Sequence, residues 1–196
     1  MKFKKAAMFG LDARIALAIF GALSVISGAA LYSAIQQAKV TQIMTQTNNI
    51  AMAIEQYLLD TGSLPPNCGG TSAFDLDITA LTTKPSGVTG WQGPYIALEE
   101  NGVCKLVRPT DSKNIILSYS NSQEWADEAA DERTCKKSGV SCSLYVIYQT
   151  TRDLEDELEA AYDGNDNKLA GKFRARSTDT FIDTGISFDK ANAITN

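Results

Sequence analysis

The fold is decided by residues 15–61, which read IALAIFGALSVISGAALYSAIQQAKVTQIMTQTNNIAMAIEQYLLDT. Its first part, residues 15–35, has no charged side chain and consists mainly of Ile, Leu, Ala, Val, Gly and Ser. As an α-helix these 21 residues are about 31 Å long, close to the ~30 Å hydrocarbon core of a bilayer. We therefore expect residues 11–35 to form a membrane-spanning helix.

The helical pattern continues beyond the apolar segment. Apolar side chains recur at spacings of seven, four, three and one residues, at Ile43, Ile50, Ile54, Tyr57 and Leu58. No proline interrupts the chain before Pro65, and Gly62 is a suitable helix stop. The pattern predicts one helix from about Leu11 to Asp60, whose second half, residues 36–61, is amphipathic and packs on a soluble domain.

Charged residues indicate how this helix is oriented. Lys2, Lys4 and Lys5 precede the apolar segment, and residues 1–10 contain no acid. Basic residues flanking a membrane helix stay on the cytoplasmic side. The chain after residue 35 is then expected outside the cytoplasm.

The cysteines agree with that orientation. All four follow the apolar segment, at Cys68, Cys104, Cys135 and Cys142, and none forms a Cys-x-x-Cys pair. An even number of cysteines in an exported chain is typical of disulfides. Three pairings are possible, and we favour Cys135 with Cys142, closing a short loop, together with Cys68 with Cys104.

Composition excludes several classes of function. The chain has no histidine, so Ser–His and Cys–His catalysis and histidine zinc sites are ruled out. The net charge of −5 argues against a nucleic-acid-binding surface. No glycine-rich phosphate loop or Gly-x-Ser-x-Gly elbow is present, and we expect a protein that is not an enzyme.

Three kinds of N-terminal segment fit the first 35 residues. One is a secretory signal cut after Ala29 or Ala30, and another is an uncleaved signal anchor. The third is a short basic leader that ends at Gly10, just before the apolar segment. A cleaved signal peptide has no reason to continue into a long amphipathic helix, so the third is favoured.

Two further motifs follow the predicted helix. Residues 57–65 read YLLDTGSLP, and residues 90–96 read GWQGPYI, after Ala80-Leu81 and Lys84-Pro85. In this order, the basic leader, the helix and these motifs resemble the type IV pilins and, most closely, the pseudopilins of type II secretion. The resemblance covers about residues 1–98.

The resemblance implies an α+β fold, in which a long N-terminal helix packs on a small antiparallel sheet. It divides the chain into a prepilin leader (1–10), the transmembrane half (11–35) and the amphipathic half (36–61) of the helix, and a periplasmic globular head (62–196). A prepilin peptidase is expected to cut between Gly10 and Leu11, and Leu11 is expected to be methylated.

The expected function is that of a structural subunit of a pseudopilus or a related pilus-like fibre. Its partners would be the prepilin peptidase, other pilin or pseudopilin subunits and an inner-membrane assembly platform. It would be a single-pass inner-membrane protein with a cytoplasmic N-terminus, and part of an extracytoplasmic fibre after assembly.

One position departs from the family pattern. Family members usually carry glutamate at the fifth residue after cleavage, which pairs with the N-terminal amine of a neighbouring subunit, and here that residue is Ile15. Asp12 and Arg14 are the nearest charged residues. Either Asp12 takes over the pairing, or the chain is a minor or tip subunit that needs none.

In the head, residues 95–98 and 103–107 suggest a hairpin around Glu100-Asn101-Gly102. Residues 114–119 and 143–149 are further strand candidates. A helix is expected from Asp153 to Tyr162, with a strand after it near residues 171–174. We expect the acids of this helix to lie on a solvated surface, at Glu155, Asp156, Glu157 and Glu159.

Oxygen-bearing side chains at Asp163, Asn165 and Asn167 suggest a calcium site, the only cofactor expected. The spacing does not fit an EF-hand loop, because the sixth position is Lys168 and the twelfth is Arg174. Major pseudopilins resemble calcium binders near their C-terminus, which keeps calcium as an expectation.

An alternative function is a minor pilin of a DNA-uptake or adhesion pilus. It would require a basic stripe on the head, for which the candidates are Lys136, Lys137, Lys168, Lys172, Arg174 and Arg176. A second alternative is a secreted binding domain, released by signal peptidase near residue 30.

Overall fold

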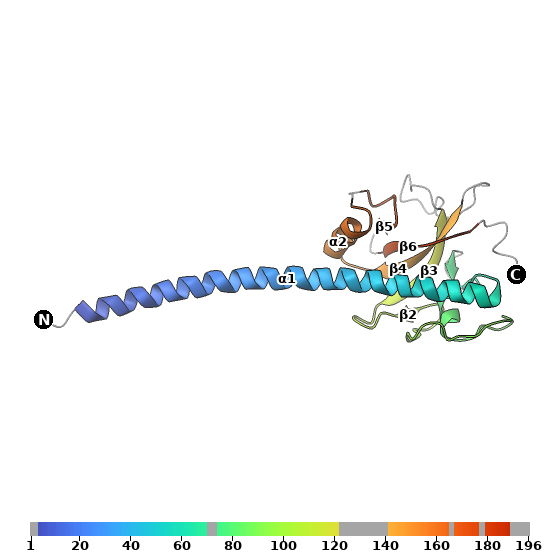
Figure 1. The fold of residues 1–196 in the computed structure, drawn as a ribbon, viewed down its shortest axis with the longest axis horizontal. Helices are drawn as coiled ribbons and strands as arrows, with labels where there is room; N and C mark the ends of the chain where they lie inside the picture. The colour runs from blue at the N-terminus through green and yellow to red at the C-terminus, as the bar shows by residue number, and fades with distance from the viewer. Residues whose placement is uncertain (1–3, 70–73, 122–140, 165–166, 177–178, 189–196) are drawn as a thin grey trace. The chain divides into compact units, whose positions relative to one another are not determined.

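The computed structural model describes residues 4–69, 74–121, 141–164, 167–176 and 179–188. The chain forms two compact units, Met1–Lys39 and Val40–Asn196, which are treated separately. Its elements are α1 (Lys4–Thr61), β1 (Asp75–Leu76), the 3-10 helix η1 (Ile78–Leu81), β2 (Leu106–Val107), β3 (Asn114–Asn121), β4 (Cys142–Gln149), α2 (Arg152–Tyr162), β5 (Phe173–Arg176) and β6 (Asp179–Phe188) (Figure 1).

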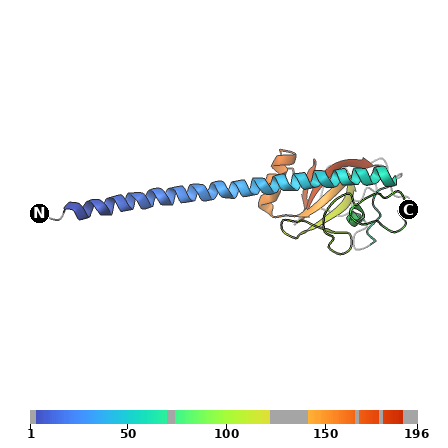
Figure 2. The ribbon, with the colours of Figure 1, turned by 60° about the horizontal axis from the view of Figure 1, so that its bottom comes forward.

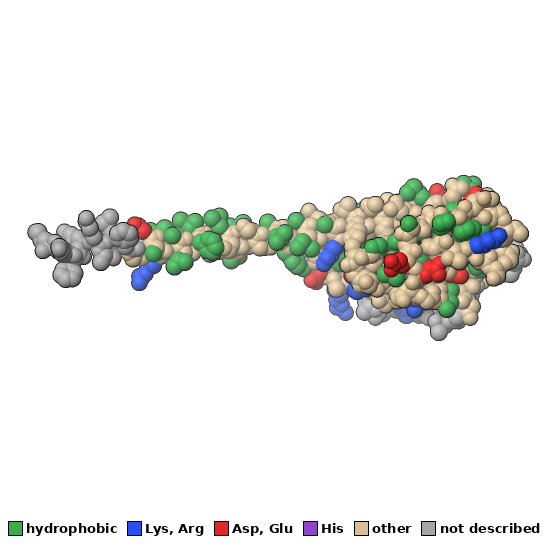
Figure 3. Space-filling model, turned by 90° about the horizontal axis from the view of Figure 1, so that it is seen from below, with side chains coloured by type: hydrophobic (Ala, Val, Ile, Leu, Met, Phe, Trp, Pro, Cys, Tyr) green, Lys and Arg blue, Asp and Glu red, His purple; other side chains and the backbone are tan. Residues whose placement is uncertain are grey.

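The first unit consists of the N-terminal part of α1. The predicted long helix is confirmed, and it begins at Lys4 rather than near Leu11. Asp12–Thr61 contains a stretch with a mean hydropathy of 2.1, long and apolar enough to cross a membrane, and none of that stretch is buried. Large apolar side chains such as Leu17, Phe20 and Val25 are more than two-thirds exposed, and hydrophobic side chains cover this part of α1 in Figure 3. Such a surface needs lipid or other apolar helices around it.

The second unit is built on one antiparallel sheet. The strand order is β1-β3-β4-β6-β5, and β2 also pairs with β3 beside β1. Figure 2 shows the C-terminal half of α1 running across the strands of this sheet. The predicted strands at residues 114–119 and 143–149 are confirmed as β3 and β4, which pair from Ile115 with Tyr148 to Asn121 with Cys142. The strand expected near residues 171–174 is confirmed as β5.

The C-terminal half of α1 packs on this sheet, as the stripe predicted. Ile43, Ile50, Ile54 and Tyr57 are buried, in one cluster with apolar side chains of β3 and β4. Leu58 is only partly buried at the edge of that cluster. Together with the sheet, α1 confirms the predicted α+β pilin-like fold.

One expectation about strands is only partly right, and one strand was not expected. Residues 95–98 form no strand, and within residues 103–107 only Leu106–Val107 is a strand. The predicted hairpin is present in a shorter form: Glu100 meets Leu106 in an isolated antiparallel bridge, and the Val107 N–H donates to the Glu99 carbonyl oxygen at 2.8 Å. The ten-residue strand β6 was not expected, although it lies between β4 and β5. Asp179, Asp183 and Gly185 weaken the strand pattern of its sequence.

The predicted helix near residues 153–162 is confirmed as α2, but the expectation that all its acids are solvated is wrong. Glu155 and Glu159 are 5% and 2% exposed, whereas Asp156 and Glu157 are exposed. Thr150 Oγ1 donates a hydrogen bond to Glu155 Oε1 at 3.3 Å. The buried acids share the inner face of α2 with Leu154 and Leu158, so packing of that face decides their burial.

Candidate assembly surface

The Trp-Gln-Gly-Pro-Tyr segment, residues 91–95, is fastened to the 3-10 helix η1 at both ends. Trp91 Nε1 donates a hydrogen bond to the Ala80 carbonyl oxygen at 2.8 Å. The Tyr95 backbone N–H donates to the Leu81 carbonyl oxygen at 2.7 Å. The motif is thus a structural element that places its backbone against the head.

Tyr95 joins this segment to the end of α1. Its ring makes edge-to-face contacts with Tyr57 of α1 and with Trp91, with 5.7 Å between ring centroids in both pairs. The Gln92 backbone N–H donates to the Tyr95 hydroxyl at 2.9 Å. Desolvation, with Asp60 nearby, raises the pKa of the Tyr95 hydroxyl above its ordinary value of 10.

Glycines allow the close approach of this segment. A Cβ atom at Gly90 would lie 2.1 Å from the Asp60 carbonyl oxygen, and Gly90 has a φ of +79°. A Cβ at Gly93 would lie 2.8 Å from the rings of Trp91 and Tyr95. Both positions exclude larger residues, which explains the two glycines of the motif.

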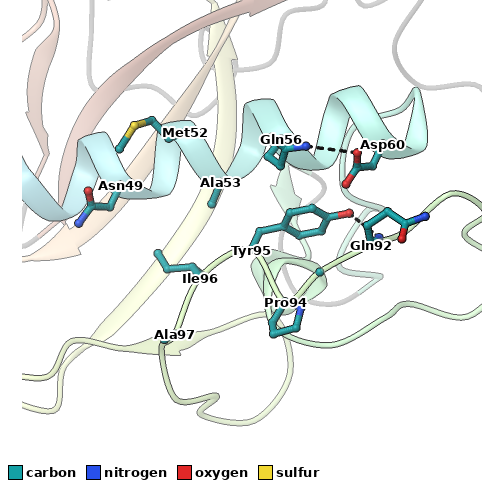
Figure 4. A pocket seen from close by; sticks show the side chains of 11 residues that line it. Asn49, Met52, Ala53, Gln56, Asp60, Gln92, Pro94, Tyr95, Ile96 and Ala97 are labelled. Atoms are coloured by element: carbon teal, nitrogen blue, oxygen red, sulfur yellow. Dashed lines mark hydrogen bonds between the residues drawn. The ribbon is translucent and has the colours of Figure 1, made fainter.

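A groove lies between α1 and the segment, and Figure 4 shows its eleven lining residues. The helix contributes Asn49, Met52, Ala53, Gln56 and Asp60, the segment contributes Gln92, Gly93, Pro94 and Tyr95, and the two residues after it, Ile96 and Ala97, complete the lining. The Tyr95 ring lies between the two walls, and Asp60 and Gln92 lie together at one end of the groove. None of the lining residues is basic.

The sequence pattern did not single out this groove. Met52 is 58% exposed and lies off the buried stripe of α1. An apolar side chain at an exposed helix position is a weak signal, because such residues are common on protein surfaces.

The expected processing residues all lie on α1. Gly10 and Leu11 fall within the helix, and the side chains of Asp12 and Arg14 are exposed. Cleavage after Gly10 and the pairing role of Asp12 stay predictions. Ala29 and Ala30, the alternative signal-peptidase site, also lie inside α1.

One predicted disulfide is confirmed, between Cys68 and Cys104, whose Cα atoms are 5.8 Å apart. The bond joins the segment beside β1 to the segment before β2, and both strands pair with β3. Cys142 begins β4, but Cys135 lies outside the described residues, so their pairing stays a prediction.

The expected calcium ligands are only partly described. Asp163 accepts backbone hydrogen bonds with both carboxylate oxygens, from Lys172 N at 3.1 Å and Phe173 N at 2.8 Å. Asn167 Oδ1 accepts one from Leu169 N, and Asn165 lies outside the described residues. Within the described ranges no three His, Cys, Asp or Glu side chains gather as a metal site. These side chains alone do not supply a calcium shell, and calcium binding stays a prediction.

Of the candidates for the basic stripe of a DNA-binding pilin, Arg174 is buried, whereas Lys172 is exposed and Arg176 is half-buried. Arg174 is 2% exposed, and its guanidinium lies 5.2 Å from the centroid of the Tyr145 ring. Lys168 makes an ion pair with Asp156. Lys136 and Lys137 lie outside the described residues. The expectation for Arg174 is therefore wrong, because this residue is part of the interior.

Comparisons with known proteins agree with the motifs. Residues 30–103 match the family described as type II secretion system (T2SS), protein G, and this range contains every residue that lines the groove. Over 91 residues, the chain is 30% identical to the type II secretion system core protein G of Xanthomonas campestris pv. campestris. The aligned residues make up 46% of this chain and 57% of that protein. The chain thus spans little more than half the length of this relative.

No solved structure matches the chain. The sequence match and the helix, motif and sheet described above nevertheless agree with each other. Residues 30–103 are similar to the type II secretion protein G family, as the resemblance of the motifs to pseudopilins predicted.

Proposed function

We propose that this chain is a structural subunit of a type II secretion pseudopilus or a closely related fibre. The observation that carries the proposal is helix α1, Lys4–Thr61. It has an exposed, uncharged apolar surface over residues 15–35, and a buried stripe from Val40 to Tyr57 under the head. One half of the helix holds the subunit in the membrane, and the other half is part of the folded head. Such a subunit can be moved from lipid into a fibre without unfolding its head.

In this proposal, a prepilin peptidase removes residues 1–10, and the N-terminus of the mature chain is Leu11. The apolar helices of neighbouring subunits then replace lipid around residues 15–35. This exchange costs little net free energy, because packed helices offer apolar contacts similar to those of acyl chains. Other pseudopilins and an inner-membrane assembly platform are the partners, and the inner membrane is the location before assembly.

The role is mechanical rather than enzymatic. The family is one of structural subunits, and a sequence without histidine lacks the commonest general base. Within this role, Asp12 is the carboxylate closest to the new N-terminus. It is the candidate partner for the amine of a neighbouring subunit, since Ile15 cannot pair with it.

N-terminal peptide mapping and intact mass of the membrane-extracted protein test the proposal, in cells with and without the prepilin peptidase. A chain that starts at Leu11 only when the peptidase is present is the expected result. A soluble chain that starts near Leu31 would contradict it and would indicate a secreted domain.

A second experiment addresses Asp12 in correctly processed protein. If Asp12 pairs with the amine, Asp12→Asn lowers the yield of fibres, whereas Arg14→Gln, a neutralised charge two residues away, has a smaller effect. Equal yields for Asp12→Asn and the unchanged chain would favour the tip-subunit alternative.

A further inference from the structure

The head exposes few large apolar side chains, and their positions are informative. Among the described residues of Val40–Asn196, three are exposed: Met52 at 58%, Leu59 at 79% and Val103 at 76%. Met52 lines the groove, and Leu59 lies on α1 outside it. Val103 is the only one of the three that is not on α1.

Val103 lies in a rigid turn, residues 101–105. The Asn101 N–H donates to the Lys105 carbonyl oxygen at 2.9 Å, which closes the turn. The disulfide to Cys68 holds the next residue, Cys104. A projecting side chain on a turn that is already ordered loses little conformational entropy when it binds a partner.

The groove and the turn are complementary in character. The groove has apolar walls at Met52, Ala53 and Ile96, an acid at Asp60, and no basic residue. The turn presents an apolar tip, Val103, and a lysine two residues later, Lys105. An apolar contact flanked by opposite charges is typical of a specific protein interface.

The spacing of these groups also agrees. Ala53 and Asp60 are seven helix residues apart, or about 10 Å along the axis. Val103 and Lys105 are two residues apart, which spans at most about 7 Å, and the flexible lysine stem extends the reach. A turn that inserts Val103 beside Ala53 can therefore bring the Lys105 ammonium to the Asp60 carboxylate.

We propose that the groove formed by residues 49–60 and 92–97 binds the Val103 turn, residues 101–105, of a second copy of this chain. The contact joins two different surfaces of the same protein, so each subunit keeps one free surface of each kind and the contact can repeat from subunit to subunit. Repeated heterologous contacts generate a helical filament when the rotation from one subunit to the next does not close a ring, and a fibre of the proposed kind requires this open arrangement. The inference rests on the proposed function and specifies which head surfaces meet in the fibre.

Site-specific photo-cross-linking in the full-length chain tests the contact. A photoreactive amino acid replaces Val103, and cross-linked dimers are collected from membranes of cells that assemble the fibre. Peptide mapping is expected to place the cross-link in residues 49–60 or 92–97 of the second copy. A cross-link elsewhere in the chain, or only to a different protein, would overturn the proposal.

Two matched variants sharpen the test. Met52→Glu introduces a carboxylate into the contact and should lower the cross-link yield roughly tenfold, because a buried unpaired charge is costly. Leu59→Glu introduces the same charge at another exposed apolar residue of α1, outside the groove, and should leave the yield unchanged. Equal effects of both variants would contradict the groove as the binding site.

Charge exchange tests the polar part of the contact. Asp60→Lys and Lys105→Glu should each lower the cross-link yield, and the double variant should restore most of it. Failure of the double variant to restore the yield, with thermal unfolding unchanged, would exclude this pairing. The N-terminus of each sample is mapped in parallel: processing at Leu11 with a cross-link elsewhere overturns only this contact, whereas absence of processing contradicts the proposed function.

Discussion

Gly90 lies against the end of helix α1, so close to Asp60 that a Cβ atom at Gly90 would be 2.1 Å from the Asp60 carbonyl oxygen. The contact sets where residues 91–95 begin, and hence the width of the groove beside α1. The same contact explains why a glycine precedes Trp91 in the motif, because a larger residue would clash with the Asp60 carbonyl oxygen. The neighbouring Gly87 has the same φ of +79° but nothing within 4 Å of a Cβ atom.

Gly90→Ala is therefore expected to destabilise the head much more than Gly87→Ala. Both variants force a side chain into a left-handed conformation, which costs about 1 kcal/mol. Only Gly90→Ala adds a clash with a backbone oxygen, for a further ~1–3 kcal/mol. Denaturant unfolding of the full-length chain in detergent measures the difference. Similar losses of stability in the two variants would show that the close approach is unimportant.

A buried hydroxyl contact joins α1 to β4. Thr47 Oγ1 donates to the Ile43 carbonyl oxygen at 2.9 Å and lies 3.0 Å from the Tyr148 hydroxyl. Thr47→Val keeps the shape of the side chain but leaves a buried tyrosine hydroxyl without this partner, at a cost of about 1–3 kcal/mol. The free energy of unfolding from denaturant titration is the measurement.

Thr45→Val is the matched control for that prediction. Thr45 also donates to the carbonyl oxygen four residues earlier, at 2.8 Å, but its side chain is exposed. The expected change is within about 0.5 kcal/mol. If Thr45→Val cost as much as Thr47→Val, the link to Tyr148 would contribute nothing beyond the local helix bond.

The ion pair of Arg108 and Asp111 should make stability depend on pH. Burial alone would raise the pKa of Asp111, but its hydrogen bond and ion pair with Arg108 outweigh burial and hold it below the ordinary value of 3.8. A carboxyl with a lowered folded-state pKa stabilises the fold above its unfolded pKa, and this contribution is lost as pH falls through the folded value. Asp111→Asn should thus lower the free energy of unfolding at pH 7, and the gap should close below pH 3.8.

Asp156→Asn provides the comparison, because it removes the ion pair with Lys168, in which the carboxylate is 70% exposed. Exposed pairs contribute little, so its effect should be small at every pH. Unfolding curves at a series of pH values decide the matter. A constant deficit for Asp111→Asn from pH 7 to pH 3 would contradict the assignment to its charge.

Calcium binding is tested by thermal unfolding with calcium and with a chelator. If residues 163–167 bind calcium, a concentration 100 times the dissociation constant adds about 2.7 kcal/mol, or several degrees in the melting temperature. Asp163→Asn should abolish this shift, and Asp156→Asn on the neighbouring helix should not. Identical melting curves with calcium and chelator would leave Asp163 with a purely structural role, as acceptor for Lys172 N and Phe173 N.

The elements that the sequence predicted well are those with local causes. The uncharged run at residues 15–35 and the stripe from Ile43 to Tyr57 follow from helical periodicity, which requires no knowledge of the rest of the chain. Strands β3 and β4 are rich in Ile, Leu, Val and Tyr. Residues of these types favour a strand whichever neighbouring strand they pair with. The motifs at residues 57–65 and 90–96 also indicated the fold from local sequence alone.

Other features depended on partners distant in sequence. Strand β6 contains Asp179, Asp183 and Gly185, and its place between β4 and β5 comes from pairing on both sides rather than from its own propensity. From the sequence, Arg174 was expected on the surface, because arginine is usually exposed. Its burial follows from the sheet, which places its guanidinium beside the ring of Tyr145.

The groove is the clearest case of a feature that only the tertiary structure decides. Residues 49–60 and 92–97 are joined by more than thirty intervening residues, and neither pattern alone indicates a concave surface. The sequence by itself determined a helix that is long and apolar enough to cross a membrane and that continues into the head, because hydrophobic length and helical period are local properties of the chain. Long-range packing around Tyr57, Trp91 and Tyr95 decided which side chains the head buries and which surfaces it exposes.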